Sequence, residues 1–288
     1  MANLKLIRSQ NQPSSFYVDS TCINCGTCYW VAPETYKEID NQSAVVEREP
    51  QDLKAAYRAL FSCPTNSIGR KDKDPIMNSI LDEFPYQLED EVYHTGFHAE
   101  NSFGAASYFI KRTEGNILID SPRFVPRLSD KFKEMGGLKL QLLTHKDDVA
   151  DTDAYWNEFN SQRMIHKEDA NSKTSHYEHF FSGQEEIKLS NDLIVIPVEG
   201  HTKGSVCYLY KNKYLFTGDH LAYSPELGHL IAFKNACWYD FSKQIVSMER
   251  LLKYEFEYVL PGHDFPFRAT KEDMKESLEL CIGWMKQI

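Results

Sequence analysis

The chain has 288 residues, of which 42% are hydrophobic and 26% are charged, and its formal net charge at pH 7 is −10. These proportions are typical of a soluble globular protein with room for a small and a medium-sized domain. The negative charge argues against a nucleic-acid or anionic-membrane partner, because either would need a basic face. No apolar run approaches the roughly 20 residues that cross a bilayer, and the first residues lack a signal-peptide core. A cytoplasmic location is therefore expected.

The seven cysteines are unevenly distributed. Four fall within the first 63 residues and three are scattered through the remainder. An odd total with three thiols in close array is unlike the disulfide framework of a secreted protein. The clustered cysteines indicate a metal site. The scattered ones are expected to be small buried hydrophobic residues; they are Cys207, Cys237 and Cys281.

The clustered cysteines follow a spacing that is typical of iron–sulfur proteins. Two consecutive C-x2-C steps let one tight loop bring three thiolates to a cluster, and a later cysteine before a proline supplies the fourth. A helix predicted to open at Glu49-Pro50-Gln51-Asp52, with proline in its first turn, delivers that fourth cysteine. The alternatives are a zinc knuckle, which rarely uses this triple spacing, and unrelated free thiols. We expect one 4Fe-4S cluster, held by Cys22, Cys25, Cys28 and Cys63.

This stretch, at about residues 15–70, resembles the single-cluster bacterial ferredoxins. There is only one cysteine quartet, so there is room for only one cluster. The resemblance implies a ferredoxin-like domain, which we place at residues 1–72. A charged stretch ending in Pro75 follows and is a plausible linker. Residues 73–100 are acidic and aromatic without clear periodicity, and we interpret them as a connecting arm to a second domain at 101–288.

The pattern after residue 100 alternates strands with helices. Residues 107–110 and 116–120, separated by Thr113-Glu114-Gly115, predict a β-hairpin. Apolar runs predict further strands, and helical periodicity falls between them. The predicted strands are 138–144, 193–198, 205–210, 214–217 and 258–260, and the predicted helices are about 124–135, 153–160, 241–254 and 270–285.

Four short polar segments follow predicted strands, and each places His or Asp near Gly or at the end of a strand. They are Thr144-His145-Lys146-Asp147, Gly200-His201-Thr202-Lys203-Gly204-Ser205, Gly218-Asp219 and Pro261-Gly262-His263. A sheet scaffold presents such residues to a ligand at its strand ends. Imidazole and carboxylate together suit zinc, iron or manganese. Any one segment alone is better explained as a turn, but four in one order indicate a metal site.

The order T-H-x-D, G-H-T-x-G-S, G-D, P-G-H resembles the metallo-β-lactamase superfamily, close to its glyoxalase II-like branch, over about residues 90–270. The resemblance implies an α+β chain in which the ferredoxin-like domain precedes a four-layered αβ/βα sandwich with its metal at the edge between two sheets. It also implies that four residues match metal ligands of the family: His145, His201, Asp219 and His263.

The chain departs from the family at its leading motif, H-x-H-x-D-H. Read without a gap, Asp147 replaces the second His, and Val149-Ala150 replace the Asp-His pair that serves a second metal. A reading shifted by two residues places Asp151 and Thr152 there, which restores the Asp but not the His. Either way the second site has lost a ligand, so a dinuclear zinc centre is doubtful. We expect one divalent metal, zinc or iron.

Three functions remain open at this point. A zinc-bound water suits hydrolysis, and the resemblance implies thioester or other acyl substrates. Two imidazoles and a carboxylate also match mononuclear iron oxygenases, and the persulfide dioxygenase branch implies a sulfur substrate with the cluster as electron donor. A non-catalytic, redox-responsive module is the third. A small-molecule substrate and an electron-transfer protein are the expected partners. The candidate catalytic residues are Asp147 and Asp219, and the candidate metal ligands are His145, Asp147, His201, Asp219 and His263.

Overall fold

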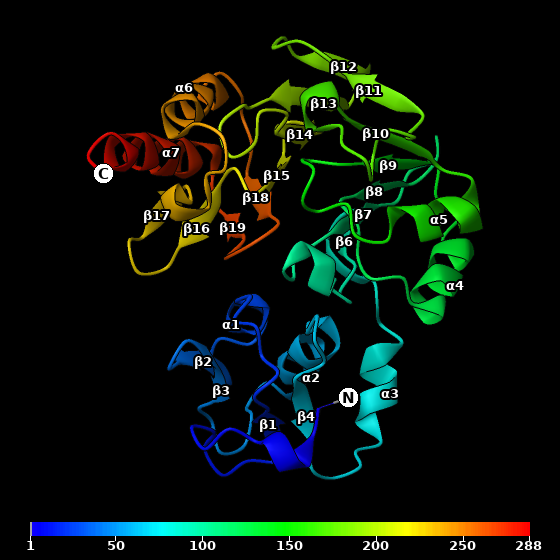
Figure 1. Cartoon of the computed structure of the whole chain (residues 1–288), viewed down its shortest axis with the longest axis vertical. Coiled ribbons are helices and arrows are strands. Elements are labelled where there is room, and N and C mark those ends of the chain that lie inside the picture. Colours follow the sequence, from blue (N-terminus) through cyan, green and yellow to red (C-terminus); the bar gives the residue numbers. More distant parts are fainter. Residues whose placement is uncertain (1) are drawn as a thin grey trace. The chain divides into compact units, whose positions relative to one another are not determined.

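The computed structural model describes residues 2–288, which form two compact units. The first unit contains the residues up to 139 together with 150–160, and the second contains 140–149 together with 161–288. Figure 1 shows the course of the chain through its helices and strands. No helix of the described residues has both the length and the apolarity needed to cross a membrane.

The cysteine-rich part of the first unit is a small α+β fold. Strand β1 pairs with β4 in antiparallel register, and β2 pairs with β3 as a hairpin. Phe16, Tyr36 and Tyr57 are fully buried in its core. The elements are η1 (Leu4–Leu6), β1 (Phe16–Val18), α1 (Thr27–Val31), β2 (Tyr36–Ile39), β3 (Gln42–Val45), α2 (Leu53–Ser62) and β4 (Ile68–Arg70).

Local sequence explains where α2 begins and ends. The Asp52 side chain accepts a hydrogen bond from the backbone N–H of Ala55 at 2.8 Å and so caps the helix. The helix ends at Cys63, because the following Pro64 disfavours helical backbone in the residue before it. Its apolar face packs into the core through Ala56, Tyr57 and Ala59. The helix thus brings Cys63 back to the loop that carries the other three cysteines, as expected.

The remainder of the first unit is an antiparallel meander in the order β8-β7-β6-β5, accompanied by three helices. The predicted hairpin at 107–120 is confirmed as β7–β8. The expected connecting arm at 73–100 contains a helix and two strands, whose three to six residues are too short to show a period. The elements are α3 (Ile76–Leu81), β5 (Tyr86–Glu89), β6 (Val92–His94), η2 (Glu100–Ser102), β7 (Tyr108–Ile110), β8 (Ile117–Ile119), α4 (Pro126–Glu134) and α5 (Thr152–Phe159).

An aromatic core holds the meander against its helices. Phe109 stacks on Phe132 of α4 with ring centroids 4.6 Å apart, and Phe132 lies 5.8 Å from Tyr155 of α5. Phe61 of α2 packs against this core as well as against the cysteine-rich one, and its ring meets Phe84 edge-on at 5.9 Å. The cysteine-rich fold and the meander are therefore packed together within one unit.

The second unit contains a parallel strand group, β11-β10-β9, and a six-stranded sheet in the order β12-β13-β14-β15-β18-β19. Strands β16 and β17 form a separate hairpin. The elements are β9 (Leu140–Leu142), β10 (Gln162–His166), η3 (Lys167–Asp169), β11 (His179–Phe181), β12 (Ile187–Ser190), β13 (Leu193–Pro197), β14 (Val206–Tyr210), β15 (Tyr214–Gly218), β16 (Ala222–Ser224), β17 (His229–Ile231), η4 (Lys234–Ala236), α6 (Phe241–Leu251), β18 (Tyr258–Pro261), β19 (Phe267–Arg268) and α7 (Lys271–Met285).

Two capped helices cover the core of the second unit. Asp240 accepts from the N–H of Lys243 to begin α6, and Thr270 accepts from the N–H of Asp273 to begin α7. Figure 1 shows these helices side by side. Their buried residues, such as Met248 and Leu278, share one apolar cluster with Leu209 and Leu215 of the sheet. All the strands and helices predicted after residue 100 are present, with ends displaced by a few residues.

Candidate metal centres

The four clustered cysteines line one small pocket in the first unit. Three come from the loop before α1 and its first turn, and Cys63 comes from the end of α2. Gly26, at φ +80°, lets the loop turn sharply between two of them. Val18, Pro64 and Ile68 supply an apolar wall. All four cysteines are free thiols.

Backbone and hydroxyl groups surround the four sulfurs. The N–H groups of Ser43 and Ser67 donate to the Sγ atoms of Cys22 and Cys63 at 3.4 and 3.2 Å. The Oγ of Ser43 lies 3.1 Å from Cys28 Sγ, and Thr27 Oγ1 lies 3.3 Å from Cys25 Sγ. Such donors stabilise the sulfurs of an iron–sulfur cluster.

The chemistry of these thiols fits a cluster. Burial raises the pKa of Cys25 to about 11 and that of Cys28 well above its usual value. Four thiolates in one small cavity would repel one another, so they need positive charge between them. The cavity therefore suits a positively charged metal centre as its occupant.

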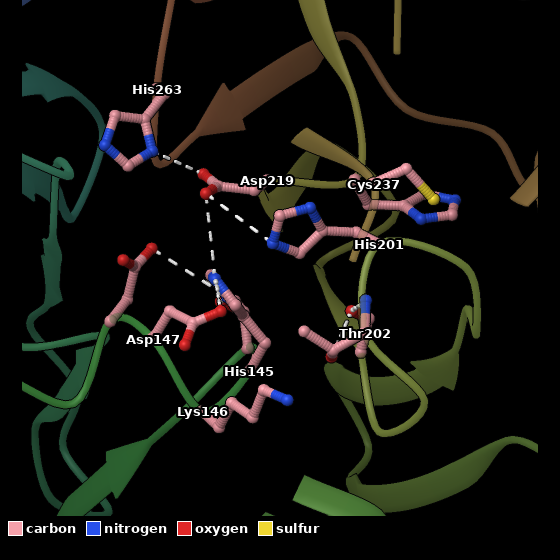
Figure 2. A network of polar contacts seen from close by, with 12 residues as sticks. His145, Lys146, Asp147, His201, Thr202, Asp219, Cys237 and His263 are labelled. Carbon is pink, nitrogen blue, oxygen red and sulfur yellow. Dashed lines mark hydrogen bonds and ion pairs between the residues drawn. The ribbon is translucent and has the colours of Figure 1, made fainter. Parts of the chain in front are cut away.

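The four predicted polar segments of the second unit meet in space. His145 follows β9, His201 follows β13, Asp219 follows β15 and His263 follows β18, each just past its strand (Figure 2). The strands are held in register by buried apolar residues. The strand ends therefore place these side chains at one locus, as the sequence indicates.

Distances between the ligand atoms fit a shared metal ion. His145 Nε2 lies 3.7 Å from Asp219 Oδ2 and 4.0 Å from Asp147 Oδ2, and His201 Nε2 lies 3.8 Å from Asp219 Oδ2. These contacts are too long for hydrogen bonds. Ligands about 2.1 Å from a tetrahedral metal lie about 3.4 Å apart, which is close to the spacing seen. His145, Asp147 and His201 form one potential metal-binding group.

The two imidazoles are buried and lack hydrogen-bond partners at the nitrogens that face the site. The Nε2 atoms of His145 and His201 have no partner. Burial, with a contribution from His201, lowers the pKa of His145 to about 3, and burial also lowers the pKa of His201. Both rings are therefore neutral at pH 7, with lone pairs available. An unpaired buried nitrogen is costly, and a metal ion would remove that cost.

His263 contacts the site through Asp219. Its Nδ1 lies 2.6 Å from Asp219 Oδ1, while the other carboxylate oxygen faces His145 and His201 (Figure 2). Burial alone would raise the pKa of Asp219, but interaction with His263, which also hydrogen-bonds to it, and with the nearby rings of His145 and His201 holds the pKa below its usual value. His263 thus fixes the orientation of Asp219, and it is not in either group of side chains close enough to share an ion.

Asp169 ties two ligand loops together, and the sequence reasoning missed it. Its buried carboxylate accepts hydrogen bonds from the N–H of Lys146, the hydroxyl of Thr202 at 2.5 Å and the N–H of Gly204 at 2.8 Å. Lys146 adjoins His145, and Thr202 adjoins His201. One carboxylate therefore orients both imidazole-bearing loops.

Crowding around Gly262 explains why the P-G-H segment has a glycine at this position. A Cβ at this position would lie 2.8 Å from both Asp148 Oδ2 and Asp219 Oδ1, so no larger residue fits. Asp148, which the sequence reasoning passed over, forms a second potential group with His145 and Asp219. Its Oδ2 lies 3.8 Å from His145 Nδ1.

The structure shows what replaces the lost ligands of the leading motif. Val149 is buried in an apolar cluster with Leu143, Ile165 and Tyr177. Asp151, the candidate in the shifted reading, accepts a hydrogen bond from the N–H of Phe124 in the first unit. Val149 thus packs in an apolar cluster, and Asp151 thus holds the backbone N–H of Phe124.

Several other histidines have contacts outside the candidate site. His166 Nε2 lies 3.1 Å from Gly183 O, and its Nδ1 accepts from the N–H of Glu168. His220 is buried, its ring nitrogens lack partners, and burial lowers its pKa to about 3. Trp238 is 64% exposed, and its ring lies 6.4 Å from that of His201. Nothing in the sequence pattern marked Trp238, because it lies in a loop.

Comparison with known proteins finds a family match for the cysteine-rich part of the chain and solved structures with a similar fold. Residues 18–70 match a family model described as the 4Fe-4S single cluster domain of Ferredoxin I. No curated protein matches the chain closely enough to count as a relative.

Solved structures match the larger part of the chain. The B3 metallo-β-lactamase BLEG-1 is 18% identical with a TM-score of 0.53, over 66% of this chain and 99% of that one. VMB-1 is 17% identical with a TM-score of 0.52, over 70% and 95%. A metallo-β-lactamase family protein from Thermus thermophilus is 14% identical with a TM-score of 0.51, over 70% and 81%.

At these identities the likeness establishes the fold alone. The expected fold class is confirmed. The chain carries a single-cluster 4Fe-4S ferredoxin domain at residues 18–70 together with a domain of the metallo-β-lactamase fold.

Proposed function

We propose that the second unit is a mononuclear metal-dependent hydrolase, with His145, His201 and Asp219 around one divalent ion, most simply zinc, and Asp147 beside it. The observation that carries this proposal is the convergence of two neutral, unpartnered imidazole nitrogens on carboxylate oxygens 3.7–4.0 Å away. A bound zinc ion would lower the pKa of its water to around 7 and supply a nucleophile.

The protein's own groups have distinct tasks in this proposal. His145 and His201 hold the ion, and Asp219, oriented by His263, adds a carboxylate. Asp147 is 46% exposed, and burial raises its pKa, so this carboxylate is the group best placed to accept a proton from a bound water. Asp147 and Asp219 are thus the proposed catalytic residues.

The substrate is proposed to be a small acyl compound such as a thioester. The exposed ring of Trp238 beside His201 offers an apolar surface for the group attached to the acyl carbon. The backbone N–H of Trp238 donates to His201 O at 2.8 Å, which holds the backbone of Trp238 beside the His201 loop. An electron-transfer protein is the proposed partner of the cluster domain.

A second function is favoured by the ligand set. Two imidazoles and a carboxylate also hold iron in mononuclear oxygenases, and this chain carries its own iron–sulfur cluster. In that case the substrate would be a sulfur compound, and the cluster would supply electrons.

Metal analysis of the full chain purified without oxygen tests these proposals. About four irons and one zinc per chain are expected for the hydrolase, and a fifth, non-cluster iron indicates the oxidoreductase. Four irons and no other metal would refute both. His201→Ala should remove the non-cluster metal and preserve the visible absorbance of the cluster. His179→Ala, at an exposed position, is the matched control and should change neither.

A further inference from the structure

Two buried histidines adjoin the cluster loop in the first unit. His94 ends β6 and His98 follows four residues later, and both have zero solvent exposure. Their Nε2 atoms are 3.0 Å apart. Trp30 meets His94 edge-on at 5.1 Å and stacks over His98 at 6.2 Å. Burial, with His98 beside it, lowers the pKa of His94 well below its usual value, so His94 is neutral.

The hydrogen bonds of the pair fix which nitrogen of each ring carries the proton. The N–H of Gly96 lies 3.2 Å from His94 Nδ1 and can only donate, so the proton of His94 is on Nε2. His94 Nε2–H then donates to His98 Nε2, which leaves the proton of His98 on Nδ1. Independently, Gly104 O, 2.7 Å from His98 Nδ1, can only accept. The bond from the Gly96 N–H and the bond to Gly104 O therefore both place the protons on His94 Nε2 and His98 Nδ1.

Thr27 connects the pair to a cluster ligand. Its Oγ1 lies 3.0 Å from His98 Nδ1, 3.1 Å from Gly104 O and 3.3 Å from Cys25 Sγ. A cluster-bound thiolate has no proton and can only accept. Because His98 Nδ1 carries a proton, it offers Thr27 no acceptor, and the Thr27 hydroxyl can donate only to Gly104 O, which already receives the His98 N–H, or to the Cys25 sulfur. The Thr27 hydroxyl is left to donate to the charged sulfur, which gives the stronger bond.

The close approach of the Gly104 loop to Cys25 is built into the backbone. Gly104 has φ +86°, and a Cβ there would lie 2.8 Å from Cys25 Sγ and 3.1 Å from Pro64 Cγ. Glycine alone avoids both the strained φ and the clash. This loop and the two histidines lie outside the residues 18–70 of the ferredoxin match. The meander thus supplies a contact to the cluster that the ferredoxin domain lacks by itself.

We propose that the neutral His94–His98 pair is a positioning device that directs the Thr27 hydroxyl onto Cys25 Sγ and thereby raises the reduction potential of the cluster. Reduction adds one negative charge to the cluster, and a hydrogen bond to its sulfur stabilises that charge. The inference concerns the cluster domain and does not depend on the reaction proposed for the second unit.

The midpoint potential of the cluster, measured on the full chain, tests the proposal. Thr27→Val should lower the potential, and Thr27→Ser, which keeps the hydroxyl, should retain it. His98→Phe should lower the potential as Thr27→Val does, because the Thr27 proton then turns to Gly104 O. His98→Asn should retain it, since an amide N–H can replace Nδ1–H. Iron and sulfide content establishes that each variant holds a complete cluster.

A double-mutant comparison separates positioning from general disturbance. In the His98→Phe background, Thr27→Val should give no further shift, because the bond it removes is already lost. Ser43→Ala is the matched control: Ser43 Oγ lies 3.1 Å from Cys28 Sγ, and its shift should be equal in both backgrounds. The proposal is overturned if Thr27→Val shifts the potential equally with and without His98, or does not shift it at all.

Discussion

The buried carboxylate of Asp169 shows how a single residue can support a metal site without touching the metal. It accepts three hydrogen bonds, from Lys146, Thr202 and Gly204, and so holds the loops of His145 and His201. Outer groups of this kind orient the ligands, and their loss commonly lowers metal affinity by about 10- to 100-fold.

Asp169→Asn is therefore expected to weaken non-cluster metal binding by about 10- to 100-fold, because an amide cannot accept from all three donors. Competition with a coloured chelator measures this affinity. Glu168→Gln is the matched control, since the neighbouring Glu168 is exposed and pairs with Lys203 at 2.7 Å. Unchanged affinity in Asp169→Asn would remove Asp169 from the support of the site.

Sequence patterns pointed to some of the residues discussed above and missed others. Cysteine spacing is set by the geometry of a cluster, so Cys22 and Cys63 were recognisable without a structure. Asp169 and Trp238 were not, because their contacts join segments far apart in the chain. His94 and His98 fit no ligand spacing along the chain, because it is the fold that brings their rings together and His98 against Thr27. The five candidate metal ligands remain predictions that metal analysis must test.

Among the elements, β10 is held to the segment before β11 by a charged pair. The guanidinium of Arg163 is 2% exposed and donates to both carboxylate oxygens of Glu178, at 2.7 and 3.1 Å. The Arg163 backbone N–H adds a third bond at 2.8 Å. Burial alone would raise the pKa of Glu178, but these bonds outweigh it and lower the pKa to about 2.

This pair gives the stability of the second unit a pH dependence. The folded pKa of Glu178 lies below the unfolded value of about 4.3, so the pair stabilises the protein above that pH. The stabilisation is lost as the pH falls from about 4.3 towards 2. Glu178→Gln should therefore lower the free energy of unfolding by about 2 kcal/mol at pH 7, with the partial exposure of the carboxylate allowed for.

Denaturant unfolding at pH 7 and pH 3 measures the effect, which should be smaller at pH 3. Glu185→Gln, at an exposed position in the same unit, should change little at either pH. An equal loss at both pH values would mean that the pair acts through packing rather than charge.

The elements themselves were predicted where they are long or clearly apolar. β13 and β14 were found because each is a continuous apolar run, and α7 was found because its fifteen residues reveal a helical period. α3, β5 and β6 were missed, because three to six residues in an acidic and aromatic stretch show none. The order of the polar segments predicted the metal locus without these elements, since it depends on strand ends in the second unit.

At the scale of the whole molecule, the proposed metal groups fall in different compact units. The four clustered cysteines lie in the first unit, and His145, His201 and Asp219 lie in the second. A bound ion stabilises the folded unit that holds it, by about 4 kcal/mol when the ion is at 1,000 times its dissociation constant. Removing the non-cluster metal should therefore lower the stability of one unit and leave the other unchanged.

Two-probe thermal unfolding tests this division in the full chain. The visible absorbance reports the cluster, and tryptophan fluorescence, compared with a Trp238→Phe control, reports the surroundings of the second site. A chelator too weak to strip the cluster should lower the midpoint of the fluorescence transition by several degrees. The midpoint of cluster bleaching should stay where it is. If the two midpoints fall together, the chain unfolds as one cooperative body, and the stability of each metal centre depends on the other.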